Sequence, residues 1–372
     1  MRRGVSTAVA LLGMAAVVGL AMVLVGRPAM AQRPIVWKVG GGWPAANPFH
    51  HSVIEIGKQV EAMSGGRLKW EIYPAGALVP AFEVLDAVHR GVLDAGHTWP
   101  GYWLGKHPAA GLFTGTPGGP FGIDQEAYNA WIYAGGGLEL YNELLQKELK
   151  MNVVAILTTP FANEPLGWFR KPVTSLKDFR GLKFRTPGWP AEVGKELGLS
   201  VVTLPAGDIL PALERGTIDG AEFSVPAVDK TLGFHNVAKY YVMPSFHQPA
   251  NYMDLLINQK RWDELPADLK AIVRNAALAE IPRFAAWLLD ADSKVIQELR
   301  EQHRVNVVRT PDEILQAQLN ASTKVLEEQA KRNPFLAKVL EHQREFARRV
   351  VDYQRKIRPP LEMAAKHYWD RP

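Results

Sequence analysis

Residues 163–188 read NEPLGWFRKPVTSLKDFRGLKFRTPG, and this stretch decides the fold. Its second half predicts a helix start, a glycine stop, a short strand and a Pro-Gly break. That order places Arg185 at the carboxyl end of a strand, which is the edge where ligands bind in open α/β sheets. A guanidinium group there offers a planar fork of donors that suits a carboxylate. The alternative role for Arg185 is a surface salt bridge.

The amino terminus has the features of a secretory signal peptide. Arginines at positions 2 and 3 precede an apolar run over residues 9–25, and a small-x-small pattern ends at Ala31. We therefore predict a leader over residues 1–31 and a periplasmic location. An uncleaved membrane anchor is the alternative, because the run is nearly long enough to span a bilayer.

Charge and composition after the leader indicate a two-lobed exported protein. The net charge of +5 falls to +2 beyond residue 31, because the leader carries three arginines and no acids. No basic block with interleaved aromatic residues occurs, so nucleic acid is not predicted as a partner. The chain has no cysteine and cannot use disulfides, but 341 residues can bury a sufficient core without them. This length favours two lobes.

Two segments, offset by 125 residues at their Arg-Gly steps, repeat the same order of elements. Each contains a strand, a Pro-Ala-Gly turn, a helix, an Arg-Gly stop and a second strand, over residues 68–97 and 199–222. Parallel pairing of strands needs such a crossover. The repeat therefore predicts two α/β lobes with a cleft between them, and it places His97 and Glu222 at equivalent strand ends.

Helical patterns dominate the carboxyl-terminal part of the chain, over residues 267–300 and 312–355. An arm of this length exceeds what two small lobes need, and it indicates a brace across the lobes or a contact between subunits. The predicted organisation is lobe I over 34–158 and 249–305, lobe II over 159–248 and a helical arm over 311–372.

Motifs of common hydrolases are missing. The chain has no H-E-x-x-H, no G-x-S-x-G and no cysteine nucleophile. Its ten histidines are scattered apart from the pair His50-His51, which would not share one face of a helix. These absences lower the expectation of catalysis, and a secreted enzyme acting on organic acids is kept as the alternative function.

Three charged residues are predicted at the ends of strands, namely Glu164, Arg185 and Glu222. Together in one cleft they would form a carboxylate clamp beside a cation site. Singly, each would be a solvated surface residue.

Several motifs give the chain a resemblance to a known family. It resembles the solute-binding subunits of tripartite ATP-independent periplasmic (TRAP) transporters, especially the branch that binds 2-oxo and 2-hydroxy monocarboxylates. The resemblance covers nearly the whole chain after the leader, and its motifs are specific in combination. They are GHT at 96–98, YW at 102–103, GK at 105–106, GWFR at 167–170, LKFR at 182–185, DGAEF at 219–223, LIN at 256–258 and Trp262.

The resemblance implies a two-lobed, periplasmic-binding-protein-like α/β receptor with a ligand cleft between the lobes and a long C-terminal helical arm. Such a receptor closes over a small organic acid anion, for example pyruvate or lactate, and delivers it to the membrane permease subunits. It also implies that Arg185 pairs with the carboxylate of the substrate. Tyr102 matches an aromatic residue of the pocket, and Trp99 and Trp189 are candidate walls.

The resemblance further implies a cation that bridges substrate and protein. Its ligands would be Glu164, Glu222 and the main-chain carbonyl of Phe223. Two glutamates and a substrate carboxylate exceed the single charge of an arginine, so Ca²⁺ is favoured and Na⁺ is the alternative. One departure from the family concerns the substrate: Pro160 stands where an asparagine is expected, and Asn163 lies nearby as a candidate contact.

The same branch implies a homodimer, since such an arm can be exchanged between subunits. In this chain the arm carries apolar residues at helical spacing that favour a contact, among them Ile314, Leu319, Leu336 and Val339.

Overall fold

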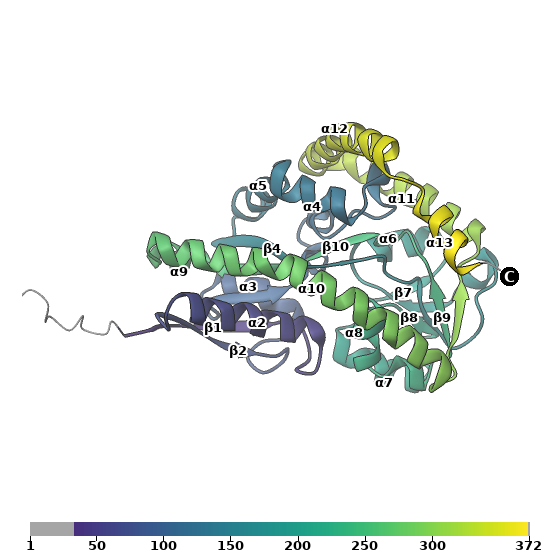
Figure 1. Cartoon of the computed structure of the whole chain (residues 1–372), viewed down its shortest axis with the longest axis horizontal. Coiled ribbons are helices and arrows are strands. Elements are labelled where there is room, and N and C mark those ends of the chain that lie inside the picture. Colours follow the sequence, from purple (N-terminus) through teal and green to yellow (C-terminus); the bar gives the residue numbers. More distant parts are fainter. Residues whose placement is uncertain (1–32, 371–372) are drawn as a thin grey trace, which may run out of the picture.

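A computed structural model describes residues 33–370, without the side chains of Pro120 and Ala162. The predicted signal peptide over residues 1–31 lies outside the described residues. Within 33–370, no helix combines the length and the apolar character that crossing a membrane requires. Two sheets with helices around them form the fold (Figure 1), which confirms the predicted two-lobed α/β class.

The first sheet has five strands in the order β2-β1-β3-β10-β4. Side chains alternate between its faces, so Leu255 and Ile257 join one core cluster while Leu256 joins another. Helices α2 and α10 cover one face, and α3, α4 and α5 cover the other. The strands are β1 (Ile35–Gly41), β2 (Leu68–Tyr73), β3 (Ala95–Thr98), β4 (Val153–Ala162) and β10 (Ala250–Asn258).

The second sheet has six strands in the order β11-β9-β5-β8-β6-β7. Its buried side chains form two further core clusters. One includes residues of α7 and α8, and the other includes Ile314 at the start of the arm. The strands are β5 (Gly167–Phe169), β6 (Lys183–Arg185), β7 (Ser200–Val202), β8 (Gly220–Ala221), β9 (Tyr240–Met243) and β11 (Asn306–Arg309).

The predicted repeat occurs in both sheets, with one refinement. The two strands of each copy do not pair with each other but flank the strand that precedes them. Thus β1 pairs in parallel with β2 and β3, and β6 pairs in parallel with β7 and β8. The carboxyl end of β6, where Arg185 stands, therefore lies in the middle of a parallel set, and the carboxyl ends of parallel strands meet at one edge.

The helices connect and cover the sheets. Glycine separates two of them, because Gly136 adopts a φ of 91° between α4 and α5. The helices are α2 (Pro48–Met63), α3 (Val84–His89), α4 (Gln125–Ala134), α5 (Gly137–Glu143), α6 (Gly188–Glu196), α7 (Ala206–Glu214), α8 (Pro226–Thr231), α9 (Gln259–Glu264), α10 (Ala267–Glu301), α11 (Asp312–Arg332), α12 (Pro334–Ile357) and α13 (Leu361–Trp369). A π-helical turn, Leu144–Glu148, follows α5, and short 3₁₀ turns occur between the other elements.

Two long elements join the lobes. Helix α10 packs against β4 and α2 of the first lobe and against α8 of the second, and it crosses the whole view in Figure 1. In the arm, α11 packs on α6 and α12 packs on α4. Leu336 and Val339 of α12 belong to the core of the first lobe, whereas Ile314 of α11 belongs to a core of the second. The arm is therefore a brace across both lobes.

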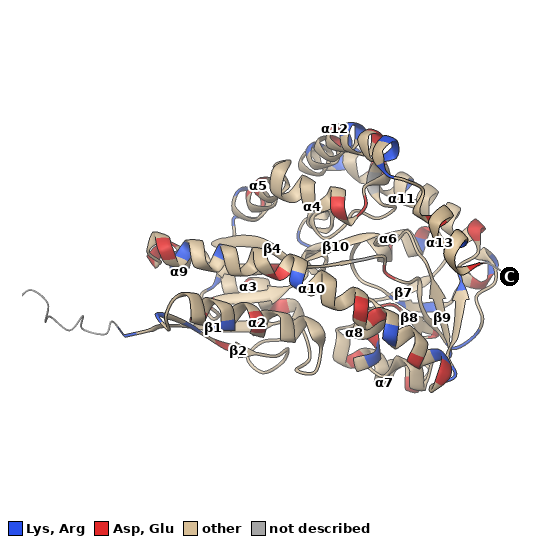
Figure 2. Ribbon diagram, in the orientation of Figure 1, with Lys and Arg blue, Asp and Glu red and all other residues tan. Residues whose placement is uncertain are grey.

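Charged residues are concentrated on the helices. Figure 2 shows lysine, arginine, aspartate and glutamate along α10 and α12, whereas the strands of the first sheet are largely uncharged. Arg185, Glu164 and Glu222 are exceptions, because all three are buried. A buried charge is costly unless it is paired, so this group is the natural starting point for a functional site.

Candidate functional site

A small, partly open cavity lies between the two lobes. The first lobe contributes aromatic residues, the second contributes charged ones, and the segments that pass between the lobes contribute the rest. The lining residues are Trp43, Phe49, Trp99, Tyr102, Phe161, Glu164, Arg185, Pro187, Glu222, Phe223, Gln248 and Met253.

Arg185 ends β6 and is 1% exposed. Its Nε donates to the carbonyl of Leu204 at 2.9 Å, and its Nη1 donates to the carbonyl of Glu222 at 2.7 Å and to Glu222 Oε1 at 3.2 Å. Its Nη2 is buried and has no hydrogen-bond partner. Because a buried donor without a partner is costly, Nη2 marks a place where a ligand can accept hydrogen bonds.

Two glutamates share this single guanidinium group. Glu222 follows β8, and Glu164 lies in the segment after β4. The main-chain N–H of Glu164 donates to the carbonyl of Gln248 at 3.2 Å. Burial, followed by repulsion from Glu222 and Asp229, raises the pKa of Glu164 well above its usual value. Burial also raises the pKa of Glu222, and Arg185 opposes that shift. If both carboxyls are ionised, the cavity carries more negative charge than Arg185 can balance, so either one of them takes up a proton or a cation pairs with them.

His247 lies beside these charged groups as a neutral imidazole, and the sequence analysis did not identify it. Its Nε2 lies 3.0 Å from Glu164 Oε2, and burial lowers the pKa of its imidazole to about 3. One ligand atom from each of Glu164, Glu222 and His247 lies within 4.8 Å of the other two. The local signal for His247 is a group of polar residues between two strands, Ser245, His247 and Gln248.

Gln248 is a second residue that the sequence did not reveal. It lines the cavity, is 2% exposed, and its Nε2 has no hydrogen-bond partner. Together with Arg185 Nη2, it offers a second unpaired N–H group close to the cavity. Two such donors beside two carboxylates are the chemistry expected of a site that takes an anion and a cation together.

Aromatic side chains close the cavity on the first-lobe side. The rings of Trp99 and Tyr102 meet edge to face at 5.2 Å, and Trp99 Nε1 donates to Asn251 Oδ1 at 3.3 Å. Burial raises the pKa of Tyr102, so its phenol stays protonated and can donate. On the opposite side, the guanidinium group of Arg185 stands 5.4 Å from the centre of the Phe223 ring.

The structure brings together most of the predicted site residues but not all. Glu164, Arg185, Glu222, Phe223, Tyr102 and Trp99 line one cavity, whereas Asn163 and Trp189 do not. Asn163 is exposed, with a φ of 57°. Trp189, on α6, is buried in the core cluster of the first lobe.

His97 also lies apart from the cavity, although the repeat makes it equivalent to Glu222. It is the last residue but one of β3, its Nδ1 accepts from Trp43 Nε1 at 3.0 Å, and its Nε2 contacts Thr159 Oγ1 at 3.1 Å. Burial lowers its pKa to about 3. Equivalent positions in the two lobes therefore serve different purposes, one inside the first lobe and one in the cleft.

The residues present fit a hard cation. Glu164 and Glu222 supply carboxyl oxygens at a buried place where a cation would balance their charge, and oxygen ligands are those that Ca²⁺ and Na⁺ take. Phe223, next to Glu222, also lines the cavity and carries a further main-chain carbonyl oxygen.

A family model and a relative of known name both match most of the chain. Residues 39–333 match the model of a family described as bacterial extracellular solute-binding protein, family 7. A relative from Nostoc sp., named as a monocarboxylate 2-oxoacid-binding periplasmic protein, is 31% identical over 323 residues, covering 86% of each chain.

Two solved structures are similar over most of the chain. A TRAP transporter solute-binding protein from Bordetella bronchiseptica RB50, a dimer with calcium and picolinate bound, has a TM-score of 0.84 and 29% identity, covering 91% of this chain and 97% of that one. A TRAP solute-binding protein from Pseudoalteromonas atlantica with bound sodium and pyruvate has a TM-score of 0.82 and 29% identity, covering 91% and 100%.

Proposed function

The chain belongs to family 7 of the bacterial extracellular solute-binding proteins, as a TRAP transporter receptor, and we propose that it captures a 2-oxo or 2-hydroxy monocarboxylate. The substrate would be a small acid such as pyruvate or lactate, bound together with a cation. The receptor would hold it in the periplasm and deliver it to the membrane permease. The family is one of transport proteins, so the alternative of a secreted enzyme is not carried further.

The observation that carries this proposal is the pairing of unused donors with excess acids in one cavity. Arg185 Nη2 and Gln248 Nε2 have no partners, while Glu164 and Glu222 share one arginine. An anion alone would satisfy the donors but would add negative charge. A cation alone would balance the acids but would leave the donors unpaired. An anion and a cation together satisfy both.

Counting charges favours a divalent ion. Glu164, Glu222 and the carboxylate of the substrate carry three negative charges, and Arg185 carries one positive charge. A divalent cation brings the sum to zero, whereas a monovalent one leaves a buried excess. Glu164, Glu222 and the carbonyl of Phe223 would hold the ion. When bound, it supplies a positive centre for the oxygens of the acid, and its preference for oxygen ligands suits Ca²⁺.

The size of the cavity favours an acid with a short side chain. The cavity is small because bulky side chains, among them Phe49, Tyr102 and Met253, line it closely. The remaining walls are apolar and are lined by Trp43, Trp99 and Phe161. A methyl or similarly small group beside the carboxylate fits such walls, whereas a second carboxylate would face apolar rings without a counter-charge.

Calorimetry with the chain lacking the predicted leader, residues 1–31, tests this function. Pyruvate and lactate are compared with succinate as a dicarboxylate, each with Ca²⁺ present, and the acid is quantified again after long incubation. We expect one-to-one binding of the monocarboxylates, weaker binding of succinate, and recovery of all the acid. Preference for succinate would contradict the substrate class, and consumption of the acid would support an enzyme.

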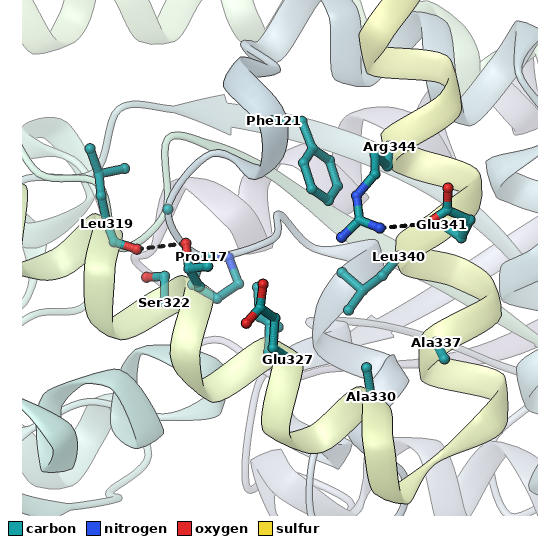
Figure 3. Close-up of a pocket in the computed structure, with 13 residues that line it drawn as sticks. Pro117, Phe121, Leu319, Ser322, Glu327, Ala330, Ala337, Leu340, Glu341 and Arg344 are labelled. Atoms are coloured by element: carbon teal, nitrogen blue, oxygen red, sulfur yellow. Dashed lines mark hydrogen bonds and ion pairs between the residues drawn. The ribbon is translucent and has the colours of Figure 1, made fainter.

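We also propose that the protein is a homodimer. The apolar residues of α11 and α12 that suggested a contact, such as Leu336 and Val339, are buried within their own chain. The proposal therefore rests on α13, in which every residue is exposed, including Leu361 at 73% and Trp369 at 83%. Figure 3 shows a groove between α11 and α12, lined by Phe121, Leu319, Leu326 and Leu340 among others, that offers α13 of a second copy an apolar seat.

Light scattering at micromolar concentration tests the dimer. We expect a dimeric mass for the protein and a monomeric mass after Leu361→Ser combined with Trp369→Ser, because these changes remove the exposed apolar surface of α13. Substitution of Glu362, on the same helix and exposed, by Gln is the matched control. A monomeric mass for the unchanged protein would refute the proposal.

A further inference from the structure

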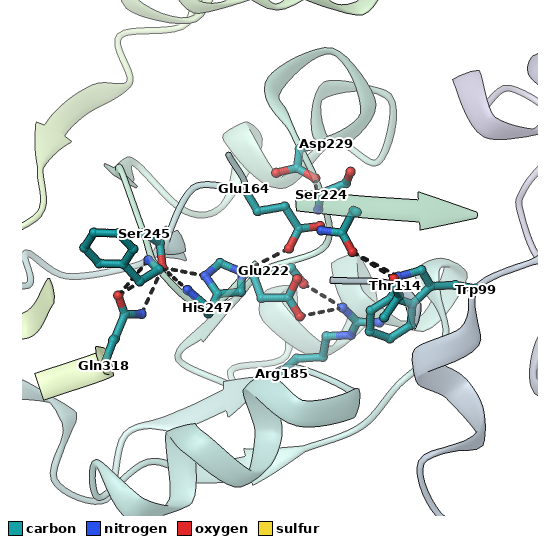
Figure 4. A network of polar contacts seen from close by, with 12 residues as sticks. Trp99, Thr114, Glu164, Arg185, Glu222, Ser224, Asp229, Ser245, His247 and Gln318 are labelled. Carbon is teal, nitrogen blue, oxygen red and sulfur yellow. Dashed lines mark hydrogen bonds and ion pairs between the residues drawn. The ribbon is translucent and has the colours of Figure 1, made fainter. Parts of the chain in front are cut away.

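A row of four buried side chains connects the cation site with the C-terminal arm (Figure 4). Glu164 Oε2 lies 3.0 Å from His247 Nε2, and His247 Nδ1 lies 2.5 Å from Ser245 Oγ. Gln318 Nε2 donates a hydrogen bond to Ser245 Oγ at 2.9 Å. Gln318 belongs to α11, and all four side chains are less than 9% exposed. We name this row, Glu164, His247, Ser245 and Gln318, the polar relay.

The direction of each hydrogen bond in the polar relay follows from counting donors and acceptors. Gln318 Oε1 accepts from the main-chain N–H of Phe246 at 3.0 Å, which orients its amide so that Nε2 donates to Ser245. The main-chain N–H of His247 also donates to Ser245 Oγ, at 3.2 Å. A hydroxyl oxygen has two lone pairs, and both are then used. The hydroxyl of Ser245 must therefore donate, and of its two acceptors His247 Nδ1 at 2.5 Å is nearer than Gln318 Oε1 at 3.2 Å.

This count fixes the tautomer of His247. Because Nδ1 accepts, the proton of the neutral imidazole is on Nε2, which donates to Glu164. An Nε2–H group cannot bind a metal. His247 is therefore a donor to Glu164 and not a ligand, even though it is near enough to Glu164 and Glu222 to share an ion with them.

We propose that Gln318 is a positioning residue that keeps His247 out of the coordination of the cation, so that the site remains a set of oxygen ligands. The inference rests on the proposed cation site. For His247 to bind a metal through Nε2, its proton must move to Nδ1, and Ser245 Oγ would then face three donors with two lone pairs. Gln318 thereby opposes imidazole-seeking ions such as Zn²⁺ and leaves the site to Ca²⁺.

Two substitutions of Gln318 change this balance in a defined way. Gln318→Glu replaces the donor to Ser245 by an acceptor, so the hydroxyl can turn toward the arm and Nδ1 can donate to Ser245. Gln318→Leu removes the donor and leaves a free lone pair on Ser245. Both should permit Nε2 to bind Zn²⁺. Gln316→Glu, two residues away on the exposed face of α11, is the matched control.

The experiment measures metal binding and the tautomer separately, with the full chain after the leader. Calorimetry gives the affinities for Ca²⁺ and Zn²⁺ in the presence of pyruvate. Nitrogen-15 spectra of the histidine rings, assigned with a His247→Gln variant, give the position of the proton. We expect the ratio of Zn²⁺ to Ca²⁺ affinity to rise about 10- to 100-fold in both Gln318 variants, with His247 shifted to the Nδ1–H form when Zn²⁺ is added.

Each other outcome has a distinct meaning. An unchanged affinity ratio and an unchanged tautomer in both variants would overturn the role of Gln318. An Nδ1–H form in the unchanged protein would overturn the polar relay. If the unchanged protein binds neither ion, the proposed cation site itself fails, and the inference fails with it.

Discussion

The cleft and the interior of the first lobe both bury carboxyl groups, but the partners of these groups differ. In the first lobe, Asp254 of β10 accepts from Tyr141 Oη at 2.6 Å, and Tyr141 in turn accepts from Trp103 Nε1 at 3.2 Å. Burial raises the pKa of Asp254 to about 7. In the cleft, Glu164 and Glu222 stand beside a guanidinium group and two unpaired N–H donors.

The difference separates a structural group from a binding group. A proton removes the charge of Asp254 and the Tyr141 phenol donates to its Oδ2, while Oδ1 is buried without a hydrogen-bond partner, so this group needs no counter-charge from outside the protein. The cleft combines an excess of acids with unpaired donors, and a proton cannot satisfy both. Buried polar groups that need an anion and a cation together therefore indicate a ligand site, whereas those satisfied by a proton and a neighbour indicate packing.

The largest effect should come from Arg185→Lys. The charge is kept but the planar fork is lost, and each charge-assisted bond to a buried group is worth roughly 1.5 to 3 kcal/mol. We expect the affinity for pyruvate to fall about 100-fold or more in calorimetry. Arg180→Lys, at an exposed position, is the control and should leave the affinity unchanged. An unchanged affinity in Arg185→Lys would remove this residue from the site.

The second effect tests the charge balance of the cleft. Glu164→Gln removes one negative charge, so Ca²⁺ affinity should fall about 10- to 100-fold and Na⁺ should support substrate binding better than before. The measurement is pyruvate affinity after chelator treatment, with each ion restored separately.

Asp254→Asn is the control for this prediction, because it changes a buried carboxyl of the first lobe and should leave the ion preference unaltered. Tight binding of pyruvate by chelated protein in sodium-free buffer would show that no cation bridges the substrate, and that Glu164 and Glu222 do not act as ligands.

The third effect concerns pH and the first lobe. The folded pKa of Asp254, about 7, lies above its ordinary value of 3.8, so its contribution to stability is fully present below about pH 4 and is lost as pH rises through 7. Between pH 5 and pH 8 this loss should reduce the free energy of unfolding by about 2 to 3 kcal/mol. Asp254→Asn, which cannot titrate, should flatten the profile measured by urea unfolding. Equal slopes in the two proteins would contradict the shift.

The smallest effect should come from Tyr141→Phe. Asp254 loses its donor and Trp103 Nε1 loses its acceptor, so the free energy of unfolding should fall by about 1 to 2 kcal/mol while pyruvate affinity stays the same. Urea unfolding and calorimetry measure the two quantities. Tyr353→Phe, at an exposed position of α12, is the control. A loss of pyruvate affinity in Tyr141→Phe would show that the two regions are coupled.

Local sequence patterns were sufficient for much of the fold and part of the site. A glycine stop, a short strand and a Pro-Gly break predict Arg185 at a strand end, and the structure ends β6 at this residue. The repeat predicts Glu222 at the end of the corresponding strand, and Glu222 directly follows β8. Such predictions succeed because the edge at which parallel strands end is fixed by chain direction alone.

Side-chain direction and distant neighbours were not predictable in this way. His247 and Gln248 follow a strand of the second lobe, 83 and 84 residues after Glu164, and no spacing rule connects them to it. Asn163 sits beside Glu164 in the chain but is exposed, because its left-handed backbone carries it away from the cavity. Trp189 belongs to a helix whose buried face meets the first lobe.

The sequence by itself determined the two α/β lobes, the helical arm and the strand-end positions of Glu164, Arg185 and Glu222, because turns, periodicity and chain direction are local properties. Only the tertiary structure decided that these three side chains share one buried cavity, and that Gln318 of the arm reaches them through Ser245 and His247. Such convergence depends on how two lobes and a distant helix pack, and packing sums many weak contacts between residues far apart in the chain.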